Sequence, residues 1–249
     1  MDSVKIDGIE PHVFITCSRR YDDFEENIFS LTWGKLFKSM QTDINAFEKP
    51  LKEICSELSF TDKDNEPYIE FRSSDLSKMR YAWVFKKFEN IQEKRLVLSN
   101  DADSTKISFP LFSSIEDKAP FIRCYFSAIS LRYLLYFGIG VGGCFFNVLA
   151  SLHMRTALRQ RLYRLVCSNR TKKEFTLKIS TFKSNFDVPD YDFFKLKEKI
   201  LNPFVEKLAE NPYDSIIISY EPVYEQKRVG RPKVISIKFK ILKKNEKRK

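Results

Sequence analysis

The sequence is poor in the residues that metal and nucleophile chemistry require. It has only two histidines, His12 and His153, and five cysteines in 249 residues. The cysteines are scattered and none belongs to a CxxC pair: Cys17, Cys55, Cys124, Cys144 and Cys167. A zinc site needs ligands at short spacing, and an odd number of scattered thiols is typical of a reduced, cytoplasmic protein. We therefore expect no metal, no disulfide framework and a cytoplasmic location.

Signatures of nucleotide chemistry and of secretion are also missing. The chain has no GxxxxGK[ST] phosphate loop, and two isolated histidines cannot supply the paired-His metal motif of nucleases with a tyrosine nucleophile. Gly138, Gly140 and Gly143 match GxGxxG, but the next acidic residue is Glu174, later than that fingerprint expects. The start, MDSVKIDGIEPHVF, is acidic and polar, unlike a secretory signal. We expect no cofactor and no enzymatic activity.

Charge is distributed unevenly along the chain. Residues 1–150 carry 19 Lys and Arg and 22 Asp and Glu, a net charge of −3. Residues 151–249 carry 24 and 11, a net charge of +13. A positive field concentrated in one part of a protein favours a polyanionic partner, either nucleic acid or an anionic membrane. A basic domain without such a partner is the alternative.

One uncharged run is long enough to raise the question of a membrane. Residues 133–152, YLLYFGIGVGGCFFNVLASL, hold no charge over 20 positions, which is the length of a transmembrane helix. Four of the chain's seven glycines fall within residues 138–143, however, and glycine interrupts helices. We therefore predict a helix, a glycine turn and a second helix at a domain junction. A membrane-anchored interaction protein is the alternative.

Residues 28–154 are predicted to form a first winged-helix domain after a polar extension, 1–27. Apolar residues recur at helical spacing in 28–44, 47–58 and 76–91. The period then changes to short β-branched and aromatic runs, RLVLSND, TKISFPLF and PFIRCYFS, which indicate a β-ribbon. Three helices followed by a ribbon are typical of a winged helix.

The helix before residue 155 is predicted to continue through Arg155–Val166. From Arg155 to Lys173 there are seven basic residues and no acidic one. A helix surface selected for stability alone usually mixes charges of both signs. Contacts to phosphates, including those of Arg155 and Arg159, are one interpretation, and a solvated cationic face is the other.

Residues 175–208 have the pattern of a helix-turn-helix, whose second helix enters a DNA groove. A strand is predicted from Phe175, a short helix over Thr181–Phe186, and a turn at 187–190 that Pro189 enforces. The second helix is expected to begin after an Asp190 cap and to kink or divide at Pro203. Its apolar positions face inward, and the opposite face carries Lys195, Lys199, Asn202 and Glu206.

Two alternating strands follow, at about 216–221 and 235–241, and a basic segment joins them. The segment holds Lys227, Arg228, Arg231 and Lys233 around Gly230. A basic hairpin beside a helix-turn-helix is a wing, suited to the DNA backbone or minor groove, although hairpin tips are also charged because they are solvated. A basic tail, 244–249, would add non-specific attraction. The expected fold class is α+β, with the second winged helix at 155–243.

This order of elements resembles the C-terminal winged helix of theta-type plasmid replication initiators, the iteron-binding Rep proteins. The similarity covers about 155–242. It rests on Arg161-Leu162-Tyr163-Arg164-Leu165, on Tyr191 opening the second helix, on Ile200-Leu201-Asn202-Pro203 with Leu208, and on Gly230-Arg231 to Ile241. Over 28–154 it rests on element order and on Phe126-Ser127 to Leu135. This chain departs from the pattern at Phe193, where a basic residue is expected.

The resemblance implies two tandem winged helices, the first of which mediates dimerisation and auxiliary DNA contact. It also implies recognition of double-stranded origin repeats, origin opening, recruitment of host initiator, helicase or chaperone proteins, and autorepression by a homodimer. The candidate DNA-binding residues are Lys183, Ser184, Asn185, Tyr191, Lys195, Lys199, Lys227, Arg228, Arg231, Lys233, Arg155 and Arg159. A winged-helix transcriptional repressor would share nearly all of these features.

Overall fold

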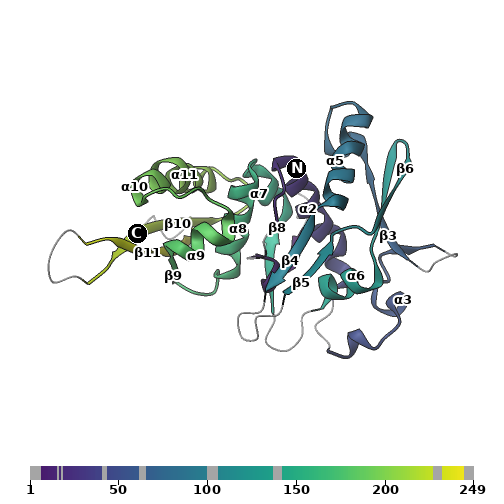
Figure 1. Ribbon diagram of the computed structural model, residues 1–249, viewed down its shortest axis with the longest axis horizontal. Coiled ribbons are helices and arrows are strands. Elements are labelled where there is room, and N and C mark those ends of the chain that lie inside the picture. The colour runs from purple at the N-terminus through teal and green to yellow at the C-terminus, as the bar shows by residue number, and fades with distance from the viewer. Residues whose placement is uncertain are drawn as a thin grey trace. The chain divides into compact units, whose positions relative to one another are not determined.

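The chain is a mixed α+β protein, as predicted, and it divides into two compact units (Figure 1). Unit 1 is Met1–Val148 and unit 2 is Leu149–Lys249. The computed structural model describes residues 7–15, 17, 19–40, 44–61, 66–99, 106–136, 142–226 and 232–243.

Unit 1 combines helices of very different length with antiparallel strands. Its α-helices are α1 (His12–Ile15), α2 (Asp23–Leu36), α3 (Leu51–Ile54), α4 (Ser73–Leu76), α5 (Tyr81–Glu93) and α6 (Ala128–Leu135), and its 3-10 helices are η1 (Phe37–Ser39) and η2 (Ile44–Phe47). Its strands are β1 (Asp7–Pro11), β2 (Ser59–Phe60), β3 (Pro67–Arg72), β4 (Arg95–Ser99), β5 (Lys106–Pro110), β6 (Ser114–Lys118), β7 (Phe121–Tyr125) and β8 (Gly143–Asn147). They pair as β1-β8, β4-β5 and β2-β3-β7-β6.

The described part of the region predicted to be a polar, irregular extension, from Asp7 onward, belongs to the unit 1 core. β1 pairs with β8, with Ile9 opposite Phe145. Arg19 is buried: its Nε and Nη2 donate to the Glu26 carboxylate at 3.2 and 2.9 Å, and its guanidinium lies 4.1 Å from the centre of the Phe29 ring. The prediction failed because it considered only local polarity, whereas a buried arginine is satisfied by a carboxylate elsewhere in the chain.

The helical stripes of unit 1 correspond to shorter helices than predicted. The stripe at 28–44 lies on α2, which begins earlier, at Asp23, and gives way to η1 after Leu36. The stripe at 47–58 holds only the single turn of α3, and that at 76–91 is divided between α4 and α5. Met79 and Trp83, two apolar residues of the last stripe, are exposed.

The three runs predicted to form a β-ribbon each contain a strand, but these strands belong to two different sheets. The runs RLVLSND, TKISFPLF and PFIRCYFS contain β4, β5 and β7. β7 pairs with two strands that were not predicted, β3 and β6. β6 has a largely exposed, charged sequence without the alternation that signals a strand, whereas β3 does alternate, with Pro67, Ile69 and Phe71 buried between half-buried neighbours.

The uncharged run 133–152 is not a continuous helix. The predicted first helix is present as α6 and ends at Leu135, but Gly143–Asn147 form strand β8 where a second helix was expected. A helix resumes only at α7 (Val148–His153). Gly138 and Gly140 of the GxGxxG match lie outside the described residues. Within the part of the chain that the structure describes, no helix has the length and apolar character needed to cross a membrane.

Helix α2 begins with a capping box, which carries a testable prediction. The Asp22 Oδ1 accepts from the N–H groups of Phe24 and Glu25 at 3.0 and 2.9 Å, and the Glu25 side chain accepts from the Asp22 N–H at 2.8 Å. Replacing Asp22 by Ala is expected to lower the free energy of unfolding by about 1 kcal/mol. Thermal denaturation of this variant beside Asp23→Ala, which leaves the cap in place, measures the difference. Equal melting temperatures would exclude a stabilising cap.

The same cap sets a pH dependence. Partial burial would raise the pKa of Asp22, but hydrogen bonds from Lys87 and from the backbone lower it below its usual value. A carboxylate with a lowered folded-state pKa stabilises the protein above its unfolded-state pKa, and this contribution disappears as the pH falls through the folded-state pKa. The difference between wild type and Asp22→Ala should therefore shrink in acid, below pH ~4.

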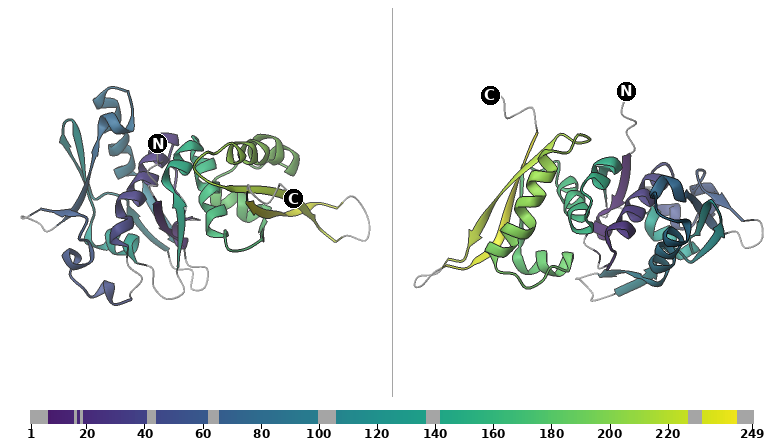
Figure 2. Two further views of the ribbon diagram at one scale, coloured as in Figure 1. Left: turned by 180° about the vertical axis from the view of Figure 1, so that it is seen from behind. Right: turned by 90° about the horizontal axis from the view of Figure 1, so that it is seen from above.

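Unit 2 is built from helices on one face of a three-stranded sheet (Figure 2). Its helical segments after α7 are α8 (Ala157–Ser168), α9 (Ile179–Phe186), α10 (Phe193–Leu196), the π-helical η3 (Lys197–Leu201) and α11 (Asn202–Ala209). Its strands are β9 (Glu174–Lys178), β10 (Ile216–Tyr224) and β11 (Val234–Lys243), in the antiparallel order β10-β11-β9. α11 packs on β10 and on α8. This helix and strand order is that of a winged helix.

The predicted continuous helix through residue 155 is wrong. α7 ends at His153, Arg155 has a left-handed φ of 68°, and the Thr156 side chain caps a new helix, α8, by accepting from the Arg159 N–H. A non-glycine residue in this conformation interrupts a helix. The strands at the end of the chain were predicted correctly in position, and Ile237 and Phe239 are buried as expected. Ile235 is exposed, because it lies near the end of the hairpin.

Candidate nucleic-acid interface

The turn of the helix-turn-helix is organised by the C-terminus of α9. Asp187 follows the helix in a left-handed conformation, with φ of 51°, and the Val188 N–H donates to the Lys183 carbonyl oxygen at 3.1 Å. This is the hydrogen-bond pattern of a Schellman motif. Val188 is buried, so the turn is anchored in the core of unit 2. The predicted turn at 187–190 is therefore present, with a defined entry geometry for the next helix.

The second helix of the motif runs without a break from 193 to 209, through α10, η3 and α11. Asp192, not the predicted Asp190, is its N-cap, and its side chain accepts from the Lys195 N–H at 2.8 Å. Pro203 neither ends nor divides the helix, because a π-helical segment precedes it and the Asn202 N–H bonds to the Lys197 carbonyl five residues back. Local π-helical adjustment is a known way to accommodate such a residue.

The two faces of the 193–209 helix have opposite character. Its inward face is apolar and buried: Leu196, Ile200, Leu201, Phe204 and Leu208. Its exposed positions include Lys195 and Lys199, as predicted, together with Lys197, Glu198 and Phe194. Three cations on five consecutive residues give this part of the helix the charge that attracts a phosphate backbone. Phe194 was not singled out from the sequence, although its place two residues before buried Leu196 predicts exposure.

Tyr191 does not open the helix, as the resemblance implies, but lies just before its cap. Its N–H donates to the Pro189 carbonyl at 2.6 Å, and the Lys195 ammonium lies 4.5 Å from the centre of its ring. Such a cation–π contact orients the lysine without neutralising its charge. Tyr191 and Lys195 thus lie together at the N-terminal end of the helix.

Of the three candidates in α9, only Ser184 presents an exposed side chain. Lys183 forms an ion pair with Asp190, and this hydrogen bond lowers the pKa of the Asp190 carboxyl. Asn185 is half-buried, and its carbonyl accepts from Arg161. Lys183 and Asn185 therefore have structural roles within the turn in addition to any contact with a ligand.

The hairpin β10–β11 projects beyond the helices of unit 2 (Figure 1) and forms the wing. Its two strands pair from Ile216 opposite Lys243 to Val223 opposite Ser236, and the register shifts before Tyr224. At the outer end the Glu225 N–H donates to the Lys233 carbonyl at 2.8 Å. Lys233 is exposed. The other candidates in the wing, Lys227, Arg228 and Arg231, lie outside the described residues.

Two of the three arginines of α8 are internal, contrary to both interpretations of the sequence. Arg161 is 5% exposed, with Nη1 3.6 Å from Asp187 Oδ2 and its guanidinium against the Phe186 ring. Arg164 is fully buried and donates to Ser151 Oγ at 3.1 Å. These two arginines connect α8 to α9 and to α7. They cannot be phosphate contacts in this conformation, because a buried guanidinium does not reach solvent.

Arg155 and Arg159 are not assembled with Lys195 and Lys199. Arg155 is exposed and Arg159 half-buried, both at the start of α8. Burial, followed by the charges of Lys207 and Arg155, lowers the pKa of His153. Lys195 and Lys199 belong to the N-terminal part of the 193–209 helix, so the two pairs lie on different elements.

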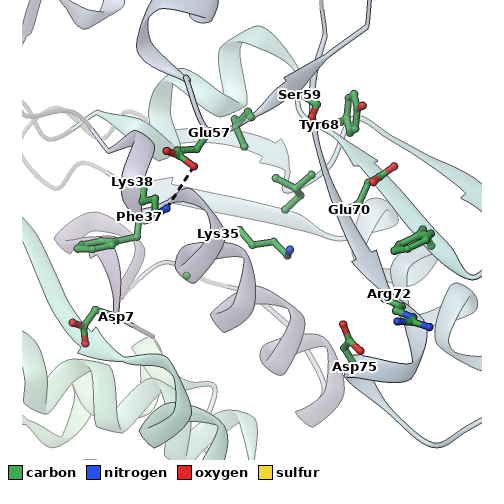
Figure 3. A pocket seen from close by; sticks show the side chains of 14 residues that line it. Asp7, Lys35, Phe37, Lys38, Glu57, Ser59, Tyr68, Glu70, Arg72 and Asp75 are labelled. Carbon is green, nitrogen blue, oxygen red and sulfur yellow. Dashed lines mark ion pairs between the residues drawn. The ribbon is translucent and has the colours of Figure 1, made fainter. Parts of the chain in front are cut away.

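A hollow of about 800 Å³ in unit 1 offers no comparable electrostatic site (Figure 3). Its lining mixes three cationic side chains, Lys35, Lys38 and Arg72, with four acidic ones. Lys38 Nζ lies 3.7 Å from Glu57 Oε2. No positive field results that would attract a polyanion. Among the residues that the structure describes, no group of three or more His, Cys, Asp or Glu could hold a metal ion.

A model of a known protein family matches the part of the chain that forms the helix-turn-helix and the wing. Residues 178–241 match the family model described as initiator Rep protein, WH2. The match begins at the last residue of β9 and ends in β11, so it covers both helices of the helix-turn-helix and both strands of the wing. No curated protein matches the chain. The match supports the predicted resemblance to replication initiators over this region.

Proposed function

We propose that the protein is a replication initiator of a plasmid or phage that binds repeated origin DNA through unit 2. The observation that carries the proposal is the match of residues 178–241 to the initiator Rep family model. The lysines on the outward face of the 193–209 helix support it, because they would meet phosphates as the helix enters a major groove. We further propose that its chemistry is binding alone, without catalysis.

The cellular part of the proposal follows from the same likeness. Bound to direct repeats (iterons), the protein would promote local strand opening and recruit host initiator, helicase or chaperone proteins in the bacterial cytoplasm. As a homodimer it would repress its own gene. Unit 1, proposed as the first of two tandem winged helices, would provide dimerisation and auxiliary DNA contact.

Replication and footprinting together test this function. A plasmid that carries the gene and its flanking DNA should replicate in a permissive host, and a stop codon in the gene should abolish replication. Footprints of the full chain should cover tandem repeats beside the gene. Protection of an operator without any replication would instead identify a transcriptional repressor.

The double substitution Lys195→Ala, Lys199→Ala tests the DNA-facing side of the helix. Each lysine that neutralises a phosphate contributes about 0.9 to the slope of log affinity against log salt. The variant should therefore lose about two units of slope and bind about ten- to fiftyfold more weakly at 0.1 M salt. Fluorescence anisotropy across a salt series measures both quantities.

A variant with the same loss of charge provides the control. Lys172 and Lys173 are exposed and lie before β9, at the end of the sheet away from the wing, since Glu174 pairs with Lys240 and Lys178 with Ser236. Lys172→Ala, Lys173→Ala should keep most of the affinity and the slope. If both double variants behave alike, binding depends on net charge and the helix is not the interface.

A further inference from the structure

Phe194 is an aromatic side chain that the fold of unit 2 leaves in water. It is 66% exposed, more than the other exposed large hydrophobic residues described in this unit, such as Tyr224 at 53% and Tyr213 at 42%. Its neighbour Phe193 is half-buried, and the two rings meet edge to face at 6.3 Å. An exposed phenylalanine contributes little to the core, so its exposure indicates a role at the surface.

Phe194 lies in the first turn of the proposed DNA-binding helix. It comes two residues after the Asp192 cap, and it points away from buried Leu196. Lys195 follows it directly. Phe194 also borders an open groove of about 530 Å³ between this helix and the wing strand β10, with Lys197 and Tyr224 on the same groove. An apolar ring thus lies close to cations that would hold a phosphate backbone.

One group on DNA suits an apolar ring at this place. In the major groove the base edges present hydrogen-bond donors and acceptors, and the 5-methyl group of thymine is the apolar exception. A phenylalanine cannot donate or accept a hydrogen bond, so against any other base edge it would leave polar groups unpaired. We propose that Phe194 contacts the 5-methyl group of a thymine and makes the protein require a T·A pair at one position of its site. This inference rests on the proposed DNA-binding function.

Removing single methyl groups from the DNA tests the proposal. A preferred duplex is first selected from a random-sequence pool with the full chain. Each thymine, on both strands, is then replaced in turn by deoxyuridine, which lacks only the methyl group, and affinity is measured by anisotropy at fixed salt. Loss of one methyl contact should weaken wild-type binding about fourfold at one position.

A double-mutant cycle assigns that effect to Phe194. The Phe194→Ala variant should bind the thymine duplex about fourfold or more weakly, and it should no longer distinguish deoxyuridine from thymine at that position. Because the ring is mostly exposed, the melting temperature of the variant should equal that of the wild type. Tyr213→Ala, which removes another exposed ring of unit 2, should keep the full preference for thymine.

The outcomes separate this inference from the function on which it rests. If the pool yields no preferred sequence, the proposed function fails and the inference falls with it. If a sequence is selected but no thymine methyl affects binding, or the effect persists in Phe194→Ala, the inference alone is overturned. A Phe194→Ala variant that binds DNA like the wild type would also overturn it.

Discussion

Phe204→Ala is expected to unfold the DNA-binding unit at ordinary temperatures or bring it close to unfolding. Phe204 is 1% exposed on α11, the part of the 193–209 helix that packs on β10 and α8. Truncating a buried phenylalanine removes its transfer free energy and leaves a cavity, at a cost of about 3–5 kcal/mol. Because whole domains are stable by only about 5–15 kcal/mol, this is a large fraction of the total.

The distribution of tryptophan allows the effect to be assigned to unit 2. Both tryptophans, Trp33 and Trp83, lie in unit 1, so their fluorescence follows that unit. Exchange of the backbone amides of β10 and β11, followed by mass spectrometry, reports on unit 2. Val205→Ala, on the half-buried side of the same turn, should cost less than about 1 kcal/mol. Equal amide protection in the two variants would contradict the packing of Phe204.

Arg161→Ala is expected to have the second largest effect on stability, about 2–3 kcal/mol. The Arg161 guanidinium donates to the carbonyl oxygen of Asn185 and lies beside Asp187, at the C-terminus of α9. A cation there satisfies an orphan carbonyl and interacts favourably with the helix dipole. Its loss would release the turn that sets the direction of the 193–209 helix. DNA affinity should therefore fall together with stability, although Arg161 does not reach the surface.

Two companion variants define this effect. Arg159→Ala removes the same charge from the half-buried part of α8 and should change the free energy of unfolding by less than about 1 kcal/mol. Arg161→Lys keeps the charge but loses the planar fork of donors, so an intermediate loss is expected. Urea denaturation followed by amide exchange in 179–190 measures all three. Arg161→Ala and Arg159→Ala of equal stability would refute the role as a helix cap.

The sequence by itself determined most of the matched region of unit 2. The turn at 187–190, the apolar face of the following helix and the two final strands were predicted because their signals are local. Pro189 excludes helix, Leu196, Ile200, Phe204 and Leu208 follow the helical period, and the strands alternate. The outward position of Lys195 and Lys199 follows from the same period. The resemblance to replication initiators then indicated the function of these elements, which no pattern of residues specifies.

The sequence patterns did not predict which charged side chains are buried or which distant strands pair, and these follow only from the fold. The sequence of α8 alone does not distinguish Arg164 from a solvated arginine. The Arg164 side chain is buried against Ser151, which belongs to another element, α7. The N-terminal segment looked irregular because the partner of β1 is β8, at the other end of unit 1. In each case the stabilising contact joins residues far apart in sequence, and the free energy of such a contact exists only once the chain has folded.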